Sequence, residues 1–387
     1  MKVQLSRSFS KLLCAAVVVS LANVVPTVVG ETLKTDDYTL SVETFADGLD
    51  TPWAVAVIDS GTALVTEKKG TLRQIVDGKL LPDAVTGTPA VNDNGQGGLL
   101  DVAIDPDYAT NGFVYLAFSD PLGGQASRKT AAMTKIVRGI IADGKWTKQK
   151  TLWEAKQADY RQGPVHFGSR IVFDSKGHLF FPIGDRGAQD HAQLLNKPNG
   201  KVHRINRDGS IPNDNPFVKT TDAYKSIYTV GNRNSQGLAI HPDTDALWGT
   251  EHGPMGGDEL NLLQSGKNYG WPIITYGKNY NGTPVGAGIT EKEGLEQHVV
   301  QWTPSPAMCG LAFVTGDQFP KWKNNLLAGA LKSGQVKRLV LDGNKVVSEE
   351  IIVKNMGRVR DVRMGPDGAI YVVLNSPGKI VRLTPTQ

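Results

Sequence analysis

The chain has 387 residues, and its shares of hydrophobic residues (40%) and charged residues (21%) are ordinary for a globular protein. Three of its positive charges lie in the first 30 residues, so the net charge of +4 falls to +1 for residues 31–387. This near-neutral balance gives no electrostatic basis for binding nucleic acid. Glycine makes up about one residue in nine, above the usual ~7%, which indicates a chain rich in turns.

Residues 1–30 have the pattern of a secretory signal peptide. Three basic residues precede a short apolar run, Leu12–Val19, and small residues in Ser20–Ala22 offer one cleavage site. The run is too short to cross a bilayer, and no second run of membrane length follows. We therefore expect a cleaved leader, a single mature domain at 31–387 and a periplasmic or secreted protein without a membrane span.

Only two cysteines are present, and Cys14 lies in the expected leader. The mature chain then keeps Cys309 alone and has no intramolecular disulfide, so its core or a metal must hold it together. No reactive-site signature surrounds Cys309, which we expect to be a small buried residue.

Six segments repeat a hairpin of two short apolar strands. These hairpins are expected at 53–66, 100–117, 165–186, 237–249, 311–329 and 362–373. A third strand follows each hairpin, at 72–75, 135–138, 202–205, 259–262, 336–339 and 380–383. Short strands that recur every ~50–75 residues, with no signal for a long helix, predict an all-β, six-bladed β-propeller with four-stranded antiparallel blades. The first and last segments are expected to share a blade and so close the ring.

Four long loops are predicted between the strands, around 120–165, 186–200, 206–230 and 272–305. Loops of this length in a compact domain usually carry functional or binding elements.

Polar residues collect where first strands start and second strands end, two places that share one face of a propeller. The starts carry Gln96–Gly98, His166, Arg233–Gln236 and Arg358–Arg360, and the ends carry Asp185–Arg186, Glu251–Pro254 and Lys332. Several cations and amides around one histidine favour a planar polyanionic ligand held by arginine forks.

Taken singly, each of these residues also has a structural interpretation. His166 could be a satisfied structural histidine, Arg358 and Arg360 a solvated strand edge, Lys332 a surface lysine, and Asp185–Arg186 an ion pair. The remaining histidines lack metal-type spacing and are interpreted as structural; they include His178, His191, His203 and His241.

The segment Glu251–Glu259 combines small residues and a proline with carboxylates just behind them. Such a segment frees backbone carbonyls from the sheet, and calcium prefers carbonyl and carboxylate oxygens. The alternative is a tight turn with acidic residues in solvent.

The ordered set of motifs resembles the soluble aldose sugar dehydrogenases that depend on pyrroloquinoline quinone (PQQ), a six-bladed propeller family related to soluble glucose dehydrogenase. Nearly the whole mature chain is covered, by Gly95–Asp101, His166–Arg170, Gly231–Gly237, Glu251–Pro254 with Gly257–Glu259, Asn268–Pro272 and Arg358–Val362.

The resemblance implies specific roles. His166 is expected to take the proton of the anomeric hydroxyl while hydride passes to PQQ, and Arg233 to stabilise charge on the quinone oxygens. Asn234, Lys332, Arg358 and Arg360 are expected to hold the cofactor. Abstraction of this proton suits an imidazole of near-neutral pKa. The cofactor would carry out the redox step, and the protein would position it.

Calcium is also implied by the resemblance. The carbonyls of Gly253 and Pro254 are expected to bind an ion that touches PQQ, and Glu259 and Tyr269 a second, structural ion. Gln96 and Asp258 are expected to face the substrate pocket or to support His166.

Two departures from the glucose-specific branch stand out. Val165 precedes His166 where that branch has an acid, and the chain lacks that branch's extra loops. Both favour a broad aldose specificity and a monomer, with an external electron acceptor that the sequence does not identify.

Two other functions remain open from the residues. A calcium-dependent sugar lactonase would need carboxylates around one axial metal, whereas this face offers mostly amides and cations. A non-enzymatic propeller that binds a protein or glycan would not need His166, Arg233 and Lys332 together.

Overall fold

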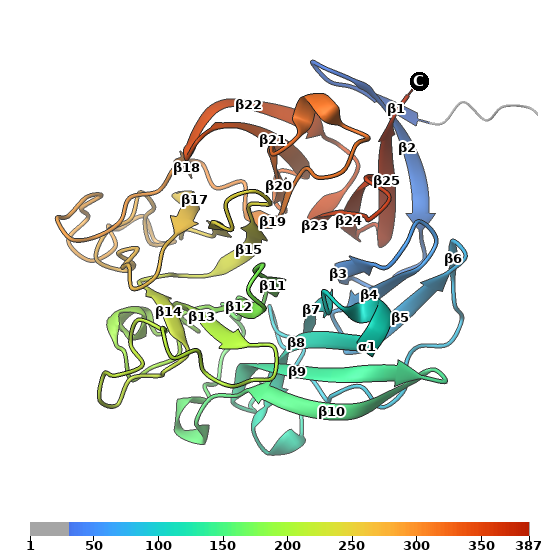
Figure 1. Cartoon of the computed structure of the whole chain (residues 1–387). Coiled ribbons are helices and arrows are strands. Elements are labelled where there is room, and N and C mark those ends of the chain that lie inside the picture. The colour runs from blue at the N-terminus through green and yellow to red at the C-terminus, as the bar shows by residue number, and fades with distance from the viewer. Residues whose placement is uncertain (1–30, 387) are drawn as a thin grey trace, which may run out of the picture. The chain divides into compact units, whose positions relative to one another are not determined.

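The computed structural model describes residues 31–386, and the expected leader at 1–30 lies outside the described residues. Six antiparallel sheets are arranged around one axis, with β3, β7, β11, β15, β19 and β23 innermost (Figure 1). This architecture confirms the predicted six-bladed β-propeller. None of the helices among residues 31–386 has the length and apolar character needed to span a membrane.

Three blades come from the first half of the chain. The first contains β3 (Pro52–Val57), β4 (Ala63–Glu67), β5 (Thr71–Val76) and β6 (Lys79–Leu80). The second contains β7 (Leu99–Ile104), β8 (Phe113–Pro121), β9 (Ala132–Ala142) and β10 (Lys145–Trp153). The third contains β11 (Val172–Phe173), β12 (His178–Ile183), β13 (Lys201–Asn206) and β14 (Ile227–Val230).

The other three blades follow in order. The fourth contains β15 (Ser235–Ile240), β16 (Leu247–Glu251), β17 (Asp258–Leu263) and β18 (Val300–Trp302). The fifth contains β19 (Met308–Phe313), β20 (Leu326–Ala330), β21 (Gln335–Asp342) and β22 (Lys345–Val353). The sixth contains β23 (Arg358–Met364), β24 (Ile370–Ser376), β25 (Lys379–Pro385), β2 (Thr39–Ala46) and β1 (Glu31–Lys34).

The sixth blade closes the ring. Strand β2 pairs antiparallel with β25, with Leu40 opposite Pro385 and Ala46 opposite Ile380. The ring is therefore closed by a strand near the start of the described chain, as expected, but this strand is 39–46, and the first predicted hairpin, 53–66, forms a blade of its own. The sixth blade has five strands rather than four, because β1 folds back on the outer edge of β2.

Within residues 31–386 the helices are all short. They are α1 (Tyr108–Asn111), η1 (Leu122–Gly124), η2 (Gln157–Asp159), η3 (Gln189–Gln193) and η4 (Pro320–Trp322). The prediction of a loop over 120–165 was wrong in part, since this region contains all of β9 and β10, which pair with each other.

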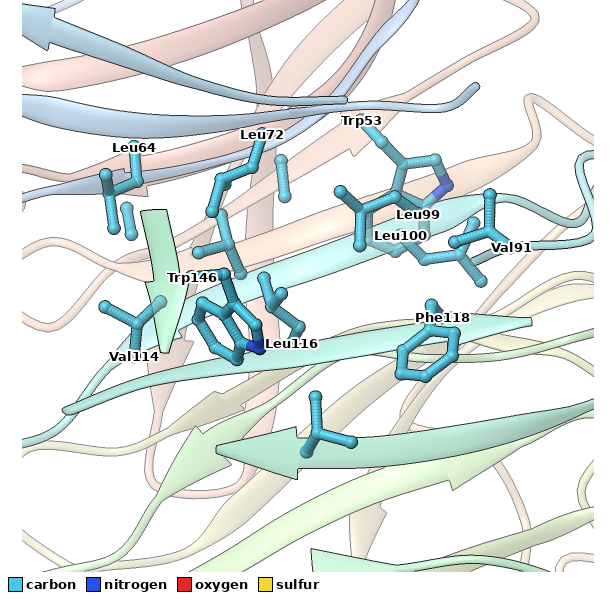
Figure 2. Close-up of a cluster of buried hydrophobic side chains, with 14 of the residues drawn as sticks. Trp53, Leu64, Leu72, Val91, Leu99, Leu100, Val114, Leu116, Phe118 and Trp146 are labelled. Carbon is cyan, nitrogen blue, oxygen red and sulfur yellow. The ribbon is translucent and has the colours of Figure 1, made fainter. Parts of the chain in front are cut away.

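Apolar side chains from adjacent blades pack against one another. Between the first two blades, Trp53, Leu72, Leu99, Phe118 and Trp146 form one buried cluster with their neighbours (Figure 2). Burial of a large apolar side chain contributes roughly 1.5–3 kcal/mol, so these interfaces fix the blades relative to the axis. Cys309 is buried in β19, as predicted.

Candidate active site

A cavity of about 840 Å³ opens where the inner strands begin. The repeat places the polar positions of different blades on this face, and the structure brings most of them together. The predicted residues that line the cavity are Gln96, His166, Arg233, Asn234, Gly253, Pro254, Lys332, Arg358 and Arg360. Asp258, Glu259 and Tyr269 are outside its lining.

His166 stands on an irregular stretch of backbone just before β11. Its φ of 57° lies in the left-handed region, which is uncommon for a residue other than glycine. Its backbone N–H donates to Oε1 of Gln96 at 2.8 Å. A Cβ on Gly184 would lie 2.4 Å from the His166 carbonyl oxygen, so only glycine fits after β12. By accepting the hydrogen bond from the His166 N–H, Gln96 supports the backbone that presents the imidazole.

The imidazole of His166 is oriented by a buried carboxylate. Its Nδ1 lies 2.6 Å from Oδ1 of Asp185, whose side chain is 1% exposed. Burial lowers the pKa of His166 below its ordinary value, with Arg233 and Arg186 adding to this effect and Asp185 opposing it. Because Nδ1 faces the carboxylate, the neutral ring keeps Nε2 unprotonated and available as a base.

Asp185 itself is fixed by several donors. The indole Nε1 of Trp271 donates to its Oδ2 at 2.9 Å, and the N–H of Gly187 to its Oδ1 at 2.8 Å. Although burial favours the neutral acid, the hydrogen bond with His166 holds the pKa of Asp185 below its usual value.

Arg186 does not pair with Asp185. Its guanidinium donates to the carbonyls of Val165 and Gly163 and lies 3.5 Å from the Phe167 ring centroid. The alternative of a structural ion pair between these two neighbours is therefore not what the structure contains. The role of Asp185 was missed because the adjacent Arg186 offered an obvious ion-pair partner, whereas its actual partner is His166.

Arg233 contacts the loop that contains His252 and Gly253. Its Nη1 donates to the carbonyls of Gly253 (2.7 Å) and His252 (2.9 Å), and its guanidinium lies 5.2 Å from the Trp271 ring centroid. Its backbone N–H donates to Oε1 of Glu251 at 2.7 Å. The Arg233 side chain is thus held against the cavity wall.

Arg360 also lines the cavity; its guanidinium stacks 4.3 Å from the Trp53 ring centroid and donates through Nη2 to Oε1 of Gln236 at 2.7 Å. The Gln236 amide in turn donates to Oδ1 of Asn234 at 3.0 Å. Burial lowers the pKa of Arg360 to about 10, so it stays cationic at neutral pH.

Several nitrogens at the cavity have no partner. Among the described residues, Nε of Arg233, Nε of Arg360 and Nε2 of His252 are buried without a hydrogen bond. Burial, followed by repulsion from Arg360 and Arg233, lowers the pKa of His252 to about 3, so this ring is neutral. Unpaired buried polar groups are costly, so a ligand that hydrogen-bonds to these nitrogens would be stabilised here. Oxygen-rich, anionic, planar PQQ fits this set of donors.

Calcium would rely mainly on backbone oxygens here. Within residues 31–386, no three His, Cys, Asp or Glu side chains are grouped to hold a metal. The carbonyl groups of Gly253 and Pro254 are the oxygen type that calcium accepts, and a carbonyl oxygen has two lone pairs, of which Arg233 uses one on Gly253.

Asp258 acts behind the cavity wall. Its two carboxylate oxygens accept from the N–H groups of Gly253 (3.0 Å) and Met308 (2.9 Å). It therefore holds the Gly253 loop in place. The prediction that Asp258 faces the pocket or supports His166 is not what the structure shows, because its carboxylate bonds to Gly253 and Met308 instead.

Glu259 lies opposite Glu251 in the pairing of β16 with β17. Burial, and then Glu251, raises the pKa of Glu259 to about 8, and burial raises that of Glu251 to about 7. The hydroxyl of Tyr269 donates to the Leu262 carbonyl, so it is already in use.

Comparisons with known proteins agree with this picture. The sequence profile of the family "Glucose / Sorbosone dehydrogenase" matches residues 49–382. The aldose sugar dehydrogenase YliI of Escherichia coli is 41% identical over 353 residues, which are 90% of this chain and 93% of that protein. Quinoprotein glucose dehydrogenase B of Acinetobacter calcoaceticus is 30% identical, with 75% of each chain covered.

Solved structures give the same result. The soluble aldose sugar dehydrogenase of Escherichia coli in its apo form superposes with a TM-score of 0.83 at 39% identity, over 90% of this chain and all of that one. The PQQ-bound aldose sugar dehydrogenase of Streptomyces coelicolor has a TM-score of 0.72 at 26% identity, over 89% and 98% of the two chains. These matches confirm the resemblance to aldose sugar dehydrogenases, and the chain belongs to the glucose/sorbosone dehydrogenase family.

Proposed function

We propose that this protein oxidises aldose sugars at the anomeric carbon to lactones, with PQQ and calcium as cofactors. One observation carries the proposal: the His166–Asp185 pair opens onto the same cavity as the cations and unpartnered nitrogens that fit PQQ. A base and a site for a polyanionic quinone are therefore adjacent. When bound, PQQ supplies the acceptor for the hydride that leaves the anomeric carbon.

The protein's own residues would handle the proton. Nε2 of His166 takes the proton of the anomeric hydroxyl, and Asp185 stabilises the imidazolium that forms and keeps the ring in register. Gln96 holds the backbone of His166 in its left-handed conformation. The guanidinium of Arg233 would stabilise negative charge on the bound quinone.

The remaining predicted residues would bind the cofactors. Asn234, Lys332, Arg358 and Arg360 would hold PQQ, and the Gly253 and Pro254 carbonyls would hold a calcium ion, which would supply Lewis-acid chemistry. We extend the proposal to a second, structural calcium at Glu259 and Tyr269, where the Tyr269 hydroxyl would have to exchange its hydrogen bond to Leu262 for the ion. We extend it also to a monomer and to export through a signal peptide at 1–30.

Reconstitution tests this function directly. Purified protein freed of cofactor would be titrated with PQQ in the presence and absence of calcium, with binding followed by absorbance. Dye reduction would then be measured with a panel of aldoses. Activity that needs both additions supports the proposal. Failure of PQQ to bind would refute it and favour a non-enzymatic binding propeller.

A further inference from the structure

The cavity has a one-sided charge. It is lined by six cationic side chains, and no Asp or Glu contributes to the lining among residues 31–386. The cations are Lys68, Arg233, Lys278, Lys332, Arg358 and Arg360. None of the six forms an ion pair with a described carboxylate, although eighteen contacts between Lys or Arg and a carboxylate occur elsewhere in the same residues.

This charge is concentrated rather than general. Residues 31–387 carry a net charge of +1, so the residues outside the cavity lining carry a net charge of −5. A cleft with charges of one sign and low-dielectric walls focuses the field and raises the rate at which oppositely charged reactants arrive. The cavity is the positive pole of an otherwise acidic molecule.

Two of the cations have no role in the function proposed above. Lys278 is exposed, on a segment that pairs with the cavity wall through backbone hydrogen bonds to Met255 (2.9 and 3.3 Å). Lys68 is half-buried and donates to the carbonyl of Asp93 at 2.7 Å. Burial lowers the pKa of Lys68 and Arg360 lowers it further, with the Asp93 carboxylate opposing them.

A bound cofactor would leave this charge incompletely balanced. The carboxylates of PQQ would offset part of it, and calcium would add positive charge. A neutral aldose gains nothing from such a field. The positive field would instead favour a negatively charged electron acceptor, which must reach the reduced cofactor through the opening of this cavity.

We propose that Lys68 and Lys278 form an anion-attracting mouth that captures a negatively charged, one-electron acceptor for the reduced enzyme. This inference rests on the proposed function. Each sugar oxidised leaves two electrons in the enzyme, so two acceptor molecules each take one electron and two protons leave to solvent. The sugar adds no charge to the mouth, and the acceptor supplies the negative charge that the mouth favours.

The test uses the holoenzyme and two acceptors of opposite charge, hexacyanoferrate(III) and hexaammineruthenium(III). The enzyme is first reduced with excess aldose, and the rate of reoxidation is then followed by stopped-flow absorbance over a range of ionic strength. The two acceptors differ in reduction potential, so their absolute rates are not compared. Instead, we compare how the reoxidation rate changes with ionic strength for each acceptor, and how each variant differs from the parent with the same acceptor.

We expect the hexacyanoferrate(III) rate to fall as salt rises and the hexaammineruthenium(III) rate to increase. The double variant Lys68→Gln/Lys278→Gln should lose about threefold to tenfold of the hexacyanoferrate(III) rate at low salt, with the loss vanishing at high salt. Lys345→Gln is the matched control, since Lys345 is an exposed lysine of β22 outside the cavity lining. It should behave like the parent.

A binding measurement completes the test. Calorimetry with redox-inert hexacyanocobaltate(III) on the holoenzyme should show binding that weakens in the double variant but not in Lys345→Gln. Equal salt slopes for both acceptors, or a variant indistinguishable from the parent, would overturn the proposal. If the double variant instead selectively slows reduction by an anionic aldose such as glucuronate, the mouth serves the sugar, and the proposal for the acceptor is wrong.

Failure of this inference is distinguishable from failure of the proposed function. In the first case the aldose still reduces the PQQ-loaded enzyme and only the reoxidation step lacks the charge dependence. In the second case no PQQ binds or no sugar reduces the loaded protein.

Discussion

Trp271 and Asp185 are 86 positions apart in the sequence, yet the indole N–H of Trp271 donates to the carboxylate of Asp185 at 2.9 Å. The face of the same indole lies beside the guanidinium of Arg233. Trp271 therefore orients both Asp185, which is the partner of His166, and Arg233.

Trp271→Phe removes the N–H and keeps an aromatic ring beside Arg233. We expect kcat to fall roughly tenfold, since a hydrogen bond to a charged group contributes ~1.5–3 kcal/mol. Asp185 loses a donor and becomes a stronger acceptor for His166, so the pKa of His166 rises. The acid limb of the kcat/KM pH profile should therefore move to higher pH. Trp248→Phe is the control, because the buried Trp248 N–H has no partner among the described residues. If the acid limb also moved in Trp248→Phe, the shift could not be assigned to the hydrogen bond from Trp271 to Asp185.

His166→Ala should retain PQQ binding and lose turnover by orders of magnitude, because only the proton acceptor is removed. Burial lowers the pKa of His166, so in the parent enzyme the acid limb of kcat/KM should lie below the ordinary histidine value of 6.5. The measurement is a pH series of initial rates together with an absorbance titration of PQQ. A variant that oxidises sugars at the parental rate would show that another group is the base.

Lys332→Ala should weaken PQQ binding before it changes the chemical step. Lys332 is exposed at the cavity and has no ion pair with a described carboxylate, so its charge is free for a cofactor carboxylate. We expect a higher dissociation constant for PQQ with a kcat near the parental value at saturating cofactor. A lower kcat with unchanged PQQ affinity would contradict this assignment.

Gly277→Ala should displace the Gly253–Pro254 loop, which we propose to bind calcium. A Cβ at Gly277 would lie 2.4 Å from the Gly256 carbonyl oxygen and 2.7 Å from the Pro254 ring, so the loop must shift. We expect weaker calcium dependence of PQQ binding in a paired titration. Gly61→Ala, where the nearest atoms are 3.4 Å away, is the control and should leave the titration unchanged.

Arg170→Met should destabilise the fold beneath the cavity. Arg170 is fully buried and pairs with Asp101 at 2.8 Å and Asp361 at 2.9 Å, and its guanidinium stacks on Trp53. Removing one partner of a buried charge network costs about 3–5 kcal/mol. Urea unfolding would measure this loss, and Lys69→Met, in an exposed pair with Asp50, should change the free energy of unfolding little.

The blades could be predicted from the sequence because each repeats a local pattern. Alternating apolar strands and glycine turns are visible within twenty residues, and all six predicted third strands exist. The ordered motifs also located His166, Arg233 and Arg360 correctly at one cavity, since propeller topology places the same blade position on the same face.

What the sequence did not reveal depends on contacts between blades and loops. Asp185 follows β12 beside Arg186, and only the fold shows that it faces His166 and Trp271 instead. Asp258 lies in the same motif as Gly253, but its two carboxylate oxygens accept hydrogen bonds from backbone N–H groups. Residue type and spacing do not specify which side of a loop a carboxylate faces.

The pairing of β2 with β25 also sets an order in time. Residues 39–46 are synthesised early, but their partner strand at 379–385 comes more than 300 residues later. Until then β2 has an unpaired edge towards the sixth blade, and the propeller cannot close. A ring joined in this way stays open throughout synthesis, so the chain completes its cavity, and can retain a cofactor there, only after β25 has been made.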